Sequence, residues 1–234
     1  MARGIQRALG ACLTLPFLAG AASTDGAAPA WRDDATARLE ALALLQTLNA
    51  DLLSHDSATL TLDRWCDAHH LASPAHIVAE RDANVDKPPT AEQRGQLQVS
   101  AVEPVRYRRV RLRCGDYVLS EADNWYVPSR LTPDMNRELD TTDIAFGRAV
   151  QALHFQRHTL SATLLWWPVP PGWEMSAPLP DTDPAPDTDA NTLQVPLKVL
   201  EHRAMLTLPD GTPFSLVVET YTGNVLAFPE PPRR

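Results

Sequence analysis

Five arginines lie in the short segment 106–113, and they are the side chains of this chain best suited to hold a small anion. Side chains alternate between the two faces of a strand, so Arg108 would share a face with Val110 and Leu112, whereas Arg109 would point to the other side. A guanidinium is planar and can bind a carboxylate through two parallel hydrogen bonds. One interpretation is that one arginine binds a small carboxylate, and the other is that all of them lie on a solvated strand face.

A glutamate in an apolar strand is the second candidate. Glu219 directly follows Leu216, Val217 and Val218. A carboxylate buried in such a strand needs a partner, whereas a glutamate on the solvent side of an alternating strand needs none. If an arginine and this glutamate lie on facing strands, they would form a pocket for an aromatic hydroxy acid or its precursor.

Two other combinations of reactive residues have simpler explanations than a chemical site. His154 and His158 have the spacing of two metal ligands on a helix, but their surroundings are typical of a strand and no third ligand follows. Ser57 lies close to His55 in sequence, but no nucleophile elbow of the GxSxG type is present, and Ser57 is better explained as a helix cap. We therefore expect neither a metal nor a cofactor.

The first part of the chain is predicted to be helical and the second part to be a sheet. Apolar residues recur at three- and four-residue spacing over 34–53, and a capped helix is predicted over 57–71. Beyond residue 72 the pattern changes to β-branched and aromatic runs separated by turns. These predicted strands are 76–80, 96–102, 105–114, 117–127, 154–165, 199–208 and 214–222. Hairpin turns such as Cys114–Asp116 favour antiparallel pairing, so the fold class is α+β.

The composition excludes several classes of protein. The 234 residues carry a net charge of −8, which would repel a phosphate backbone, so we expect no nucleic-acid partner.

Residues 167–196 contain eight prolines and alternating aspartates, and this composition predicts a disordered acidic insertion at about 168–196.

Residues 1–22 have the order of a secretory signal peptide. Arg3 and Arg7 precede a short apolar run, and small residues follow. The run is too short to span a bilayer, so we expect no membrane span in the mature chain and a periplasmic or secreted location. The alternative is a surface tail at the N-terminus.

Export would leave two cysteines in an oxidising compartment. Removal of the signal peptide would also remove Cys12, so that Cys66 and Cys114 would remain. An even pair permits a disulfide. Because Cys66 lies in an amphipathic stretch and Cys114 at the end of a strand, we expect two separately buried thiols.

The order of several short motifs resembles the chorismate pyruvate-lyase family. The resemblance runs from about Asp34 to Phe228 and is interrupted by the acidic insertion. The residues that carry it are the stretch 52–59, Arg109 to Cys114, Gly115, Asp116, Ala122, Pro128, Leu139, the turn 146–148, Gly211, Pro213 and Glu219.

The resemblance implies one domain over 34–228, with a six-stranded antiparallel sheet, flanking helices and a buried site. In that family chorismate is converted to 4-hydroxybenzoate and pyruvate without a metal or cofactor. By position, Arg109 matches the arginine that holds the ring carboxylate, Glu219 the glutamate at the hydroxyl end, and Ala58 a backbone amide facing the carboxylate. Asp123 stands where the family has a glycine, and Arg111 would replace Arg109 if the register slipped by two residues.

Two functions therefore follow from the resemblance. The first is a lyase in which Arg109 and Glu219 are the catalytic residues and Ala58 completes the substrate site. The second is an exported protein without catalytic activity that binds a small aromatic acid. In both, the partner is a small aromatic or cyclohexadiene carboxylate, and we expect a monomer.

Overall fold

The computed structural model describes residues 1, 31–179 and 192–232. Apart from residue 1, the predicted signal peptide lies outside these residues, and so does the central part of the predicted acidic insertion. The helices are α1 (Ala35–Leu53), α2 (Ala58–Ala68), α3 (Ala91–Gln96), α4 (Pro133–Thr141) and α5 (Phe146–Ala149), with short 3-10 turns at Pro128–Arg130, Gln151–Leu153 and Gly223–Leu226. The strands are β1 (Ile77–Arg81), β2 (Arg106–Cys114), β3 (Tyr117–Tyr126), β4 (Gln156–Leu164), β5 (Lys198–Thr207) and β6 (Pro213–Thr222).

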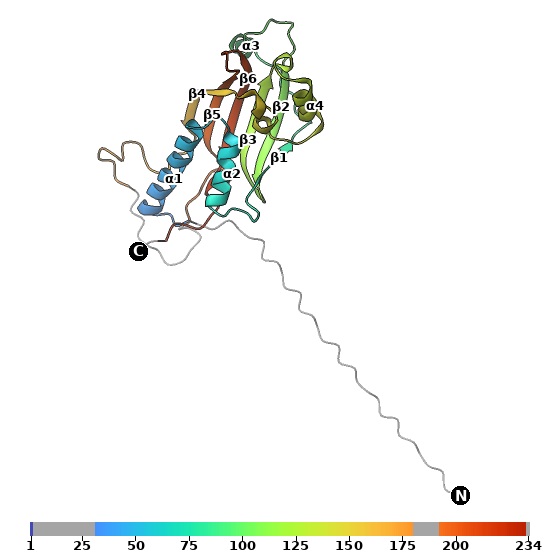
Figure 1. Cartoon of the computed structure of the whole chain (residues 1–234). Helices are drawn as coiled ribbons and strands as arrows, with labels where there is room; N and C mark the ends of the chain where they lie inside the picture. Colours follow the sequence, from blue (N-terminus) through green and yellow to red (C-terminus); the bar gives the residue numbers. More distant parts are fainter. Residues whose placement is uncertain (2–30, 180–191, 233–234) are drawn as a thin grey trace.

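The six strands form one antiparallel sheet in the order β1-β2-β3-β6-β5-β4. Helices α1 and α2 lie across one face of this sheet (Figure 1). The structure therefore confirms the predicted α+β class and the six-stranded antiparallel sheet. No helix among the described residues has the length and apolar character needed to cross a membrane.

Side-chain caps start both large helices. Asp34 caps α1 by accepting a hydrogen bond from the backbone N–H of Ala37 at 2.9 Å. Ser57 caps α2 by accepting from the N–H of Leu60, which confirms the structural role expected for this serine. Each cap satisfies one of the N–H groups that a helix leaves unpaired at its start.

The main core lies between α1, α2 and the sheet. Leu45, Leu48 and Leu62 are fully buried there, because the three- and four-residue spacing of leucines presents one side of each helix to the sheet. A smaller cluster on the opposite face of the sheet surrounds Trp125 and Leu97.

One predicted strand, 96–102, is wrong. Thr90 and Gln93 form a capping box that starts helix α3 at Ala91, and the chain after this helix forms turns. Leu97 is fully buried at the end of this helix, so its apolar character reflects core packing and not a strand.

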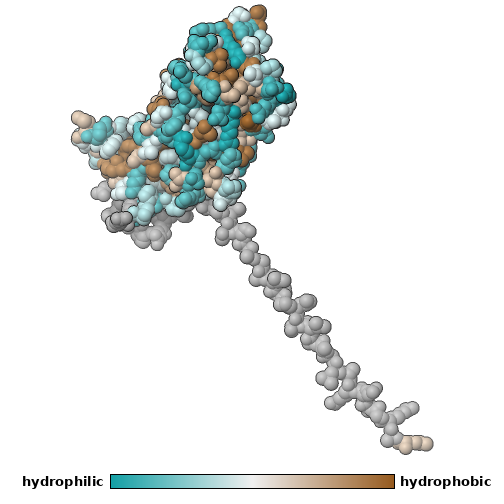
Figure 2. Space-filling model, in the orientation of Figure 1, coloured by the Kyte–Doolittle hydropathy of each residue, from teal (hydrophilic) through white to brown (hydrophobic). Residues whose placement is uncertain are grey.

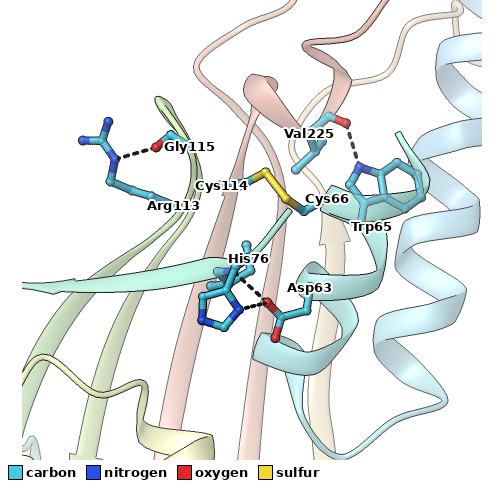
Figure 3. The surroundings of a disulfide bond; sticks show 9 residues. Asp63, Trp65, Cys66, His76, Arg113, Cys114, Gly115 and Val225 are labelled. Carbon is cyan, nitrogen blue, oxygen red and sulfur yellow. Dashed lines mark hydrogen bonds and ion pairs between the residues drawn. A yellow bond between two sulfur atoms is a disulfide. The ribbon is translucent and has the colours of Figure 1, made fainter. Parts of the chain in front are cut away.

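The expectation of two separate thiols is also wrong, because Cys66 and Cys114 form a disulfide (Figure 3). Helical periodicity places Cys66 on the core side of α2, and strand alternation turns Cys114 inward at the end of β2. The two residues are 48 positions apart, so only the packing of α2 on the sheet reveals that they meet. The bond fastens α2 to β2 close to the Trp65 indole, which donates to the Val225 carbonyl at 2.9 Å.

The described ends of the predicted insertion pack against the domain. Val169 and Leu193 are buried, and Arg38 of α1 donates to the Pro168 carbonyl at 2.7 Å. The Leu193 N–H donates to the Trp31 carbonyl at 2.8 Å. These contacts connect both ends of the insertion to the start of the folded domain.

The disulfide gives a direct chemical prediction. Alkylation of the unfolded full chain should modify one cysteine, Cys12, without reductant and all three cysteines with it. Replacing Cys66 and Cys114 by serine should lower the free energy of unfolding by about 2–4 kcal/mol, because the bond restricts the unfolded chain. Urea unfolding monitored by circular dichroism measures this loss, and three alkylated cysteines without reductant would contradict the bond.

Candidate functional site

A small cavity of about 50 Å³ lies between the inner face of the sheet and the starts of α2 and α5. Its walls are mostly apolar and come from distant parts of the chain. Its apolar lining consists of Ala58, Val110, Leu112, Ala122, Phe146, Phe155, Leu206 and Val217, and its polar lining of Asp56, Ser57, Thr59, Arg108, Asn124, Arg157 and Glu219, with Gly147 between α5 and α2. An apolar pocket with a few convergent polar groups is the usual form of a small-molecule site.

A buried ion pair lies at one side of this cavity. Arg157 Nη2 donates to Glu219 Oε2 at 2.6 Å, and the two side chains are only 4% and 9% exposed. The buried Tyr221 hydroxyl donates to the same oxygen at 3.2 Å. Burial opposes the charge of Arg157, but the Glu219 carboxylate, together with Tyr221 and Asp56, raises the pKa of the guanidinium.

Three N–H donors of cavity residues have no hydrogen-bond partner among the described residues. They are Arg157 Nε, Arg108 Nε and Asn124 Nδ2, and all three atoms are buried. Asn124 Oδ1 accepts from the Ser215 hydroxyl at 2.6 Å, which leaves Nδ2 as the atom without a partner. An unsatisfied buried polar group costs about 1–3 kcal/mol, so the cavity favours a bound group that supplies acceptors.

The first turn of α2 adds further donors to the cavity wall. The backbone N–H groups at a helix start have no partner within the helix, and Ala58 and Thr59 in this turn line the cavity. These backbone N–H groups carry the positive end of the helix dipole. Gly147 lets α5 approach closely, since a Cβ atom there would lie 3.2 Å from Ser57 Oγ.

The cavity adjoins a larger outer pocket of about 270 Å³. The two share Asp56, Ser57, Gly147 and Phe155, so these residues separate the buried space from the outside. Asp56 Oδ1 accepts from the backbone N–H of Arg157 at 3.0 Å and so connects the loop before α2 to the start of β4.

The structure brings two of the three predicted site residues together. Ala58 and Glu219 both line the cavity, but Arg109 does not. In the sheet register Glu219 pairs with Ala122, whereas Arg109 pairs with the next residue, Asp123. Because neighbouring residues of a strand point to opposite faces, Arg109 and Glu219 lie on opposite sides of the sheet.

Arg109 belongs instead to an ionic network on the outer face of the sheet. It contacts Glu121 at 3.0 Å and Asp123 at 3.3 Å, and Asp123 also accepts from Lys87 and from Tyr107, each at 2.5 Å. Burial alone would raise the pKa of Asp123, but its hydrogen bonds with Lys87 and Tyr107 and the charges of Lys87 and Arg109 lower it.

A two-residue slip to Arg111 would not restore the predicted site. Arg111 lies on the same face as Arg109, and its Nε is 3.9 Å from the Glu80 carboxylate. The predicted arrangement in which Arg109 holds a ligand opposite Glu219 is therefore corrected.

Sequence reasoning missed the two arginines that do line the cavity. Arg108 could have been found, because it shares a strand face with the apolar Val110 and Leu112. Its guanidinium donates to the carbonyls of Leu139 and Ile144 at 2.6 and 2.7 Å, and burial lowers its pKa. Arg157 carries no such signal, because most of β4 around it is exposed and polar.

The two histidines with the spacing of metal ligands do not meet at a metal site. His158 Nε2 lies 3.0 Å from the Thr207 hydroxyl, and His154 lies in the left-handed turn before β4. Within the described part of the chain no three His, Cys, Asp or Glu side chains group together as metal ligands would.

Comparison with known proteins gives one close relative. The chain is 58% identical over 202 residues to the uncharacterized protein y4mC of Sinorhizobium fredii, a match that covers 86% of this chain and 83% of the relative. No family model matches the chain.

Several solved structures are distantly similar. PhnF from Mycobacterium smegmatis is 14% identical with a TM-score of 0.45, over 75% of this chain and 68% of PhnF. A GntR-family transcriptional regulator from Enterococcus faecalis is 13% identical with a TM-score of 0.38, over 62% of this chain and 94% of the regulator. Likeness at this level concerns the chain path alone.

A buried histidine beside the ion pair makes stability depend on pH. His202 pairs with Glu219 in the sheet, and its Nε2 lies 2.8 Å from Asn49 Oδ1. Burial lowers its pKa from 6.5 to about 4, because the Glu219 charge only partly opposes burial and the Arg157 charge adds to it.

We expect the free energy of unfolding to fall as the pH drops from 6.5 towards 4. Over this interval His202 becomes protonated in the unfolded chain but stays neutral in the folded protein. This difference lowers the free energy of unfolding by about 3 kcal/mol in total. His202→Gln can keep the hydrogen bond to Asn49 but does not titrate, so this part of the pH profile should become flatter. An unchanged slope in the variant would contradict the assignment.

Proposed function

The chain belongs to the family of y4mC, and from the geometry of its buried cavity we propose that it binds a small ring-shaped carboxylic acid. The observation that carries this proposal is the set of three unpartnered buried donors around an apolar space. A planar apolar ring suits the walls, and a carboxylate supplies the acceptors that these donors lack.

The polar groups suggest how such a ligand would lie. Arg108 and Asn124 are direct neighbours across β2 and β3, so their free N–H groups are suited to a carboxylate. The N–H groups of Ala58 and Thr59 reinforce this preference through the helix dipole. Glu219 and Arg157 can accept from and donate to a hydroxyl group on the ring.

The size of the cavity requires that it open for a ligand. Its volume of about 50 Å³ is smaller than the roughly 150 Å³ of an engineered cavity that holds benzene. The wall shared with the outer pocket is the natural route, because Phe155 and the Asp56 contact to the Arg157 backbone lie in it. Ligand binding would therefore displace the start of β4 or the loop before α2.

Calorimetric titration with 4-hydroxybenzoate tests the binding proposal. Asn124→Asp keeps the acceptor for Ser215 but replaces the free donor by a negative charge. We expect it to weaken binding by about one to two decades, the equivalent of a lost charge-assisted hydrogen bond.

Arg109→Ala is the matched control, because it removes a charge from the outer face of the same sheet and should leave affinity unchanged. If the folded protein binds no hydroxybenzoate, or if Arg109→Ala abolishes binding and Asn124→Asp does not, the cavity is not the binding site.

Conversion of chorismate to 4-hydroxybenzoate and pyruvate is the second candidate function. It is favoured by the presence of Glu219 and Ala58 in one buried cavity, as the resemblance to chorismate pyruvate-lyases implies. The ring carbon that bears the hydroxyl would lose its proton, the ether bond on the neighbouring carbon would break, and the released enolpyruvate would take up a proton to become pyruvate. Glu219 would assist the proton transfer or bind the developing phenol, while the cavity excludes water.

Pyruvate release from chorismate by the purified protein, measured with a chelator present, tests this activity. Glu219→Gln should lower the turnover number more than the affinity for 4-hydroxybenzoate, because its role grows as the ring becomes aromatic. Binding of 4-hydroxybenzoate without pyruvate release above the uncatalysed rate would leave the binding function and remove the lyase.

A further inference from the structure

The two edges of the sheet differ in how they are protected against pairing with another chain. Figure 1 shows β1 at one border and β4 at the other. Strand β1 has only five residues and ends in Glu80 and Arg81, and Glu80 lies 3.2 Å from Arg113 of the next strand. Short, charged edge strands of this kind resist association.

Strand β4 lacks these protections. It has nine residues and contains no proline, lysine, aspartate or glutamate. Its one arginine, Arg157, turns into the cavity and is neutralised by Glu219. Most of its other residues are exposed, while Leu164 packs against the main core.

The irregularity in β4 adds an apolar group to this edge. The register with β5 shifts between Thr159 and Ser161, so Leu160 is bulged out of the pairing and is 49% exposed. Leu165 and Trp167, which follow the strand, are also largely exposed. Figure 2 shows apolar side chains on the projecting chain that follows β4 in Figure 1.

We propose that β4 pairs antiparallel with β4 of a second copy of this chain, so that two sheets join into one. A second copy fits this edge because electrostatic repulsion between the two β4 strands does not oppose their pairing. Although each chain carries a net charge of −8, the pairing strand itself presents no unpaired carboxylate or ammonium group. Antiparallel pairing about a twofold axis also uses the same patch on both copies, which gives a closed dimer.

The pairing would supply hydrogen-bond partners for backbone N–H and C=O groups that an edge strand otherwise leaves to water. At the start of β4 the Arg157 N–H already donates to Asp56, so the backbone groups open to pairing belong to the residues after Arg157. The exposed Leu160, Leu165 and Trp167 side chains would add the apolar area that backbone pairing alone lacks. This dimer differs from the monomer expected from sequence and does not depend on the identity of the cavity ligand.

Sedimentation velocity of the full chain over a concentration series tests the proposal. The wild type should sediment with twice the chain mass of 25.7 kDa. Leu160→Lys should reduce the mass to that of one chain at the same concentration, because it places like charges near each other across the pair. Thr163→Lys, at an exposed position of the same strand, is a second variant should Leu160→Lys fail to fold.

Val78→Lys is the matched control, since Val78 is an exposed residue of the opposite edge strand and its replacement should leave the dimer intact. A wild type that sediments as a single chain at every concentration would overturn the proposal. A dimer that persists in folded Leu160→Lys or Thr163→Lys, or that Val78→Lys dissociates, would overturn it equally.

Discussion

The ion pair between Arg157 and Glu219 is the constraint on which the interior of this protein depends. Two charges removed from water are tolerated only when each compensates the other, because a single buried charge costs several kcal/mol. Glu219 comes from the centre of the sheet and Arg157 from its edge strand. The pair therefore fixes the position of β4 relative to β6 and leaves the remaining donors of the cavity free for a ligand.

The elements around the pair hold the cavity in shape. The disulfide fastens α2 near its end, so that the start of this helix stays against the sheet beside Ala122. Arg108 holds the chain between α4 and α5 through backbone carbonyls and thereby positions Phe146 over the cavity.

The sequence was sufficient for the fold class because its signals are local. Leucine spacing and the cap at Ser57 predicted both large helices, and alternating apolar runs predicted all six strands. The strand predicted at 96–102 failed because the capping box at Thr90, which starts α3, was not recognised.

The site was only partly predictable because its assembly depends on register. Glu219 stood out as a carboxylate among apolar residues, but which arginine faces it depends on whether Glu219 pairs with Ala122 or with Asp123. No local pattern decides this, and a shift of one residue reverses the face of every side chain. The Cys66–Cys114 bond was missed for a related reason, since both partners are buried by separate local patterns that meet only in the packed domain.

A double-mutant cycle at the ion pair measures the central claim most directly. Arg157→Met and Glu219→Gln are each expected to lower the free energy of unfolding by about 3–5 kcal/mol, because each leaves the other charge buried alone. The double variant has no buried charge, and the amide that replaces the Glu219 carboxylate can still accept from Tyr221. Its loss should be smaller than the sum of the single losses by about 0.5–3 kcal/mol or more. Strictly additive losses would show that the two side chains do not compensate each other in the folded protein, and would contradict this account of the cavity.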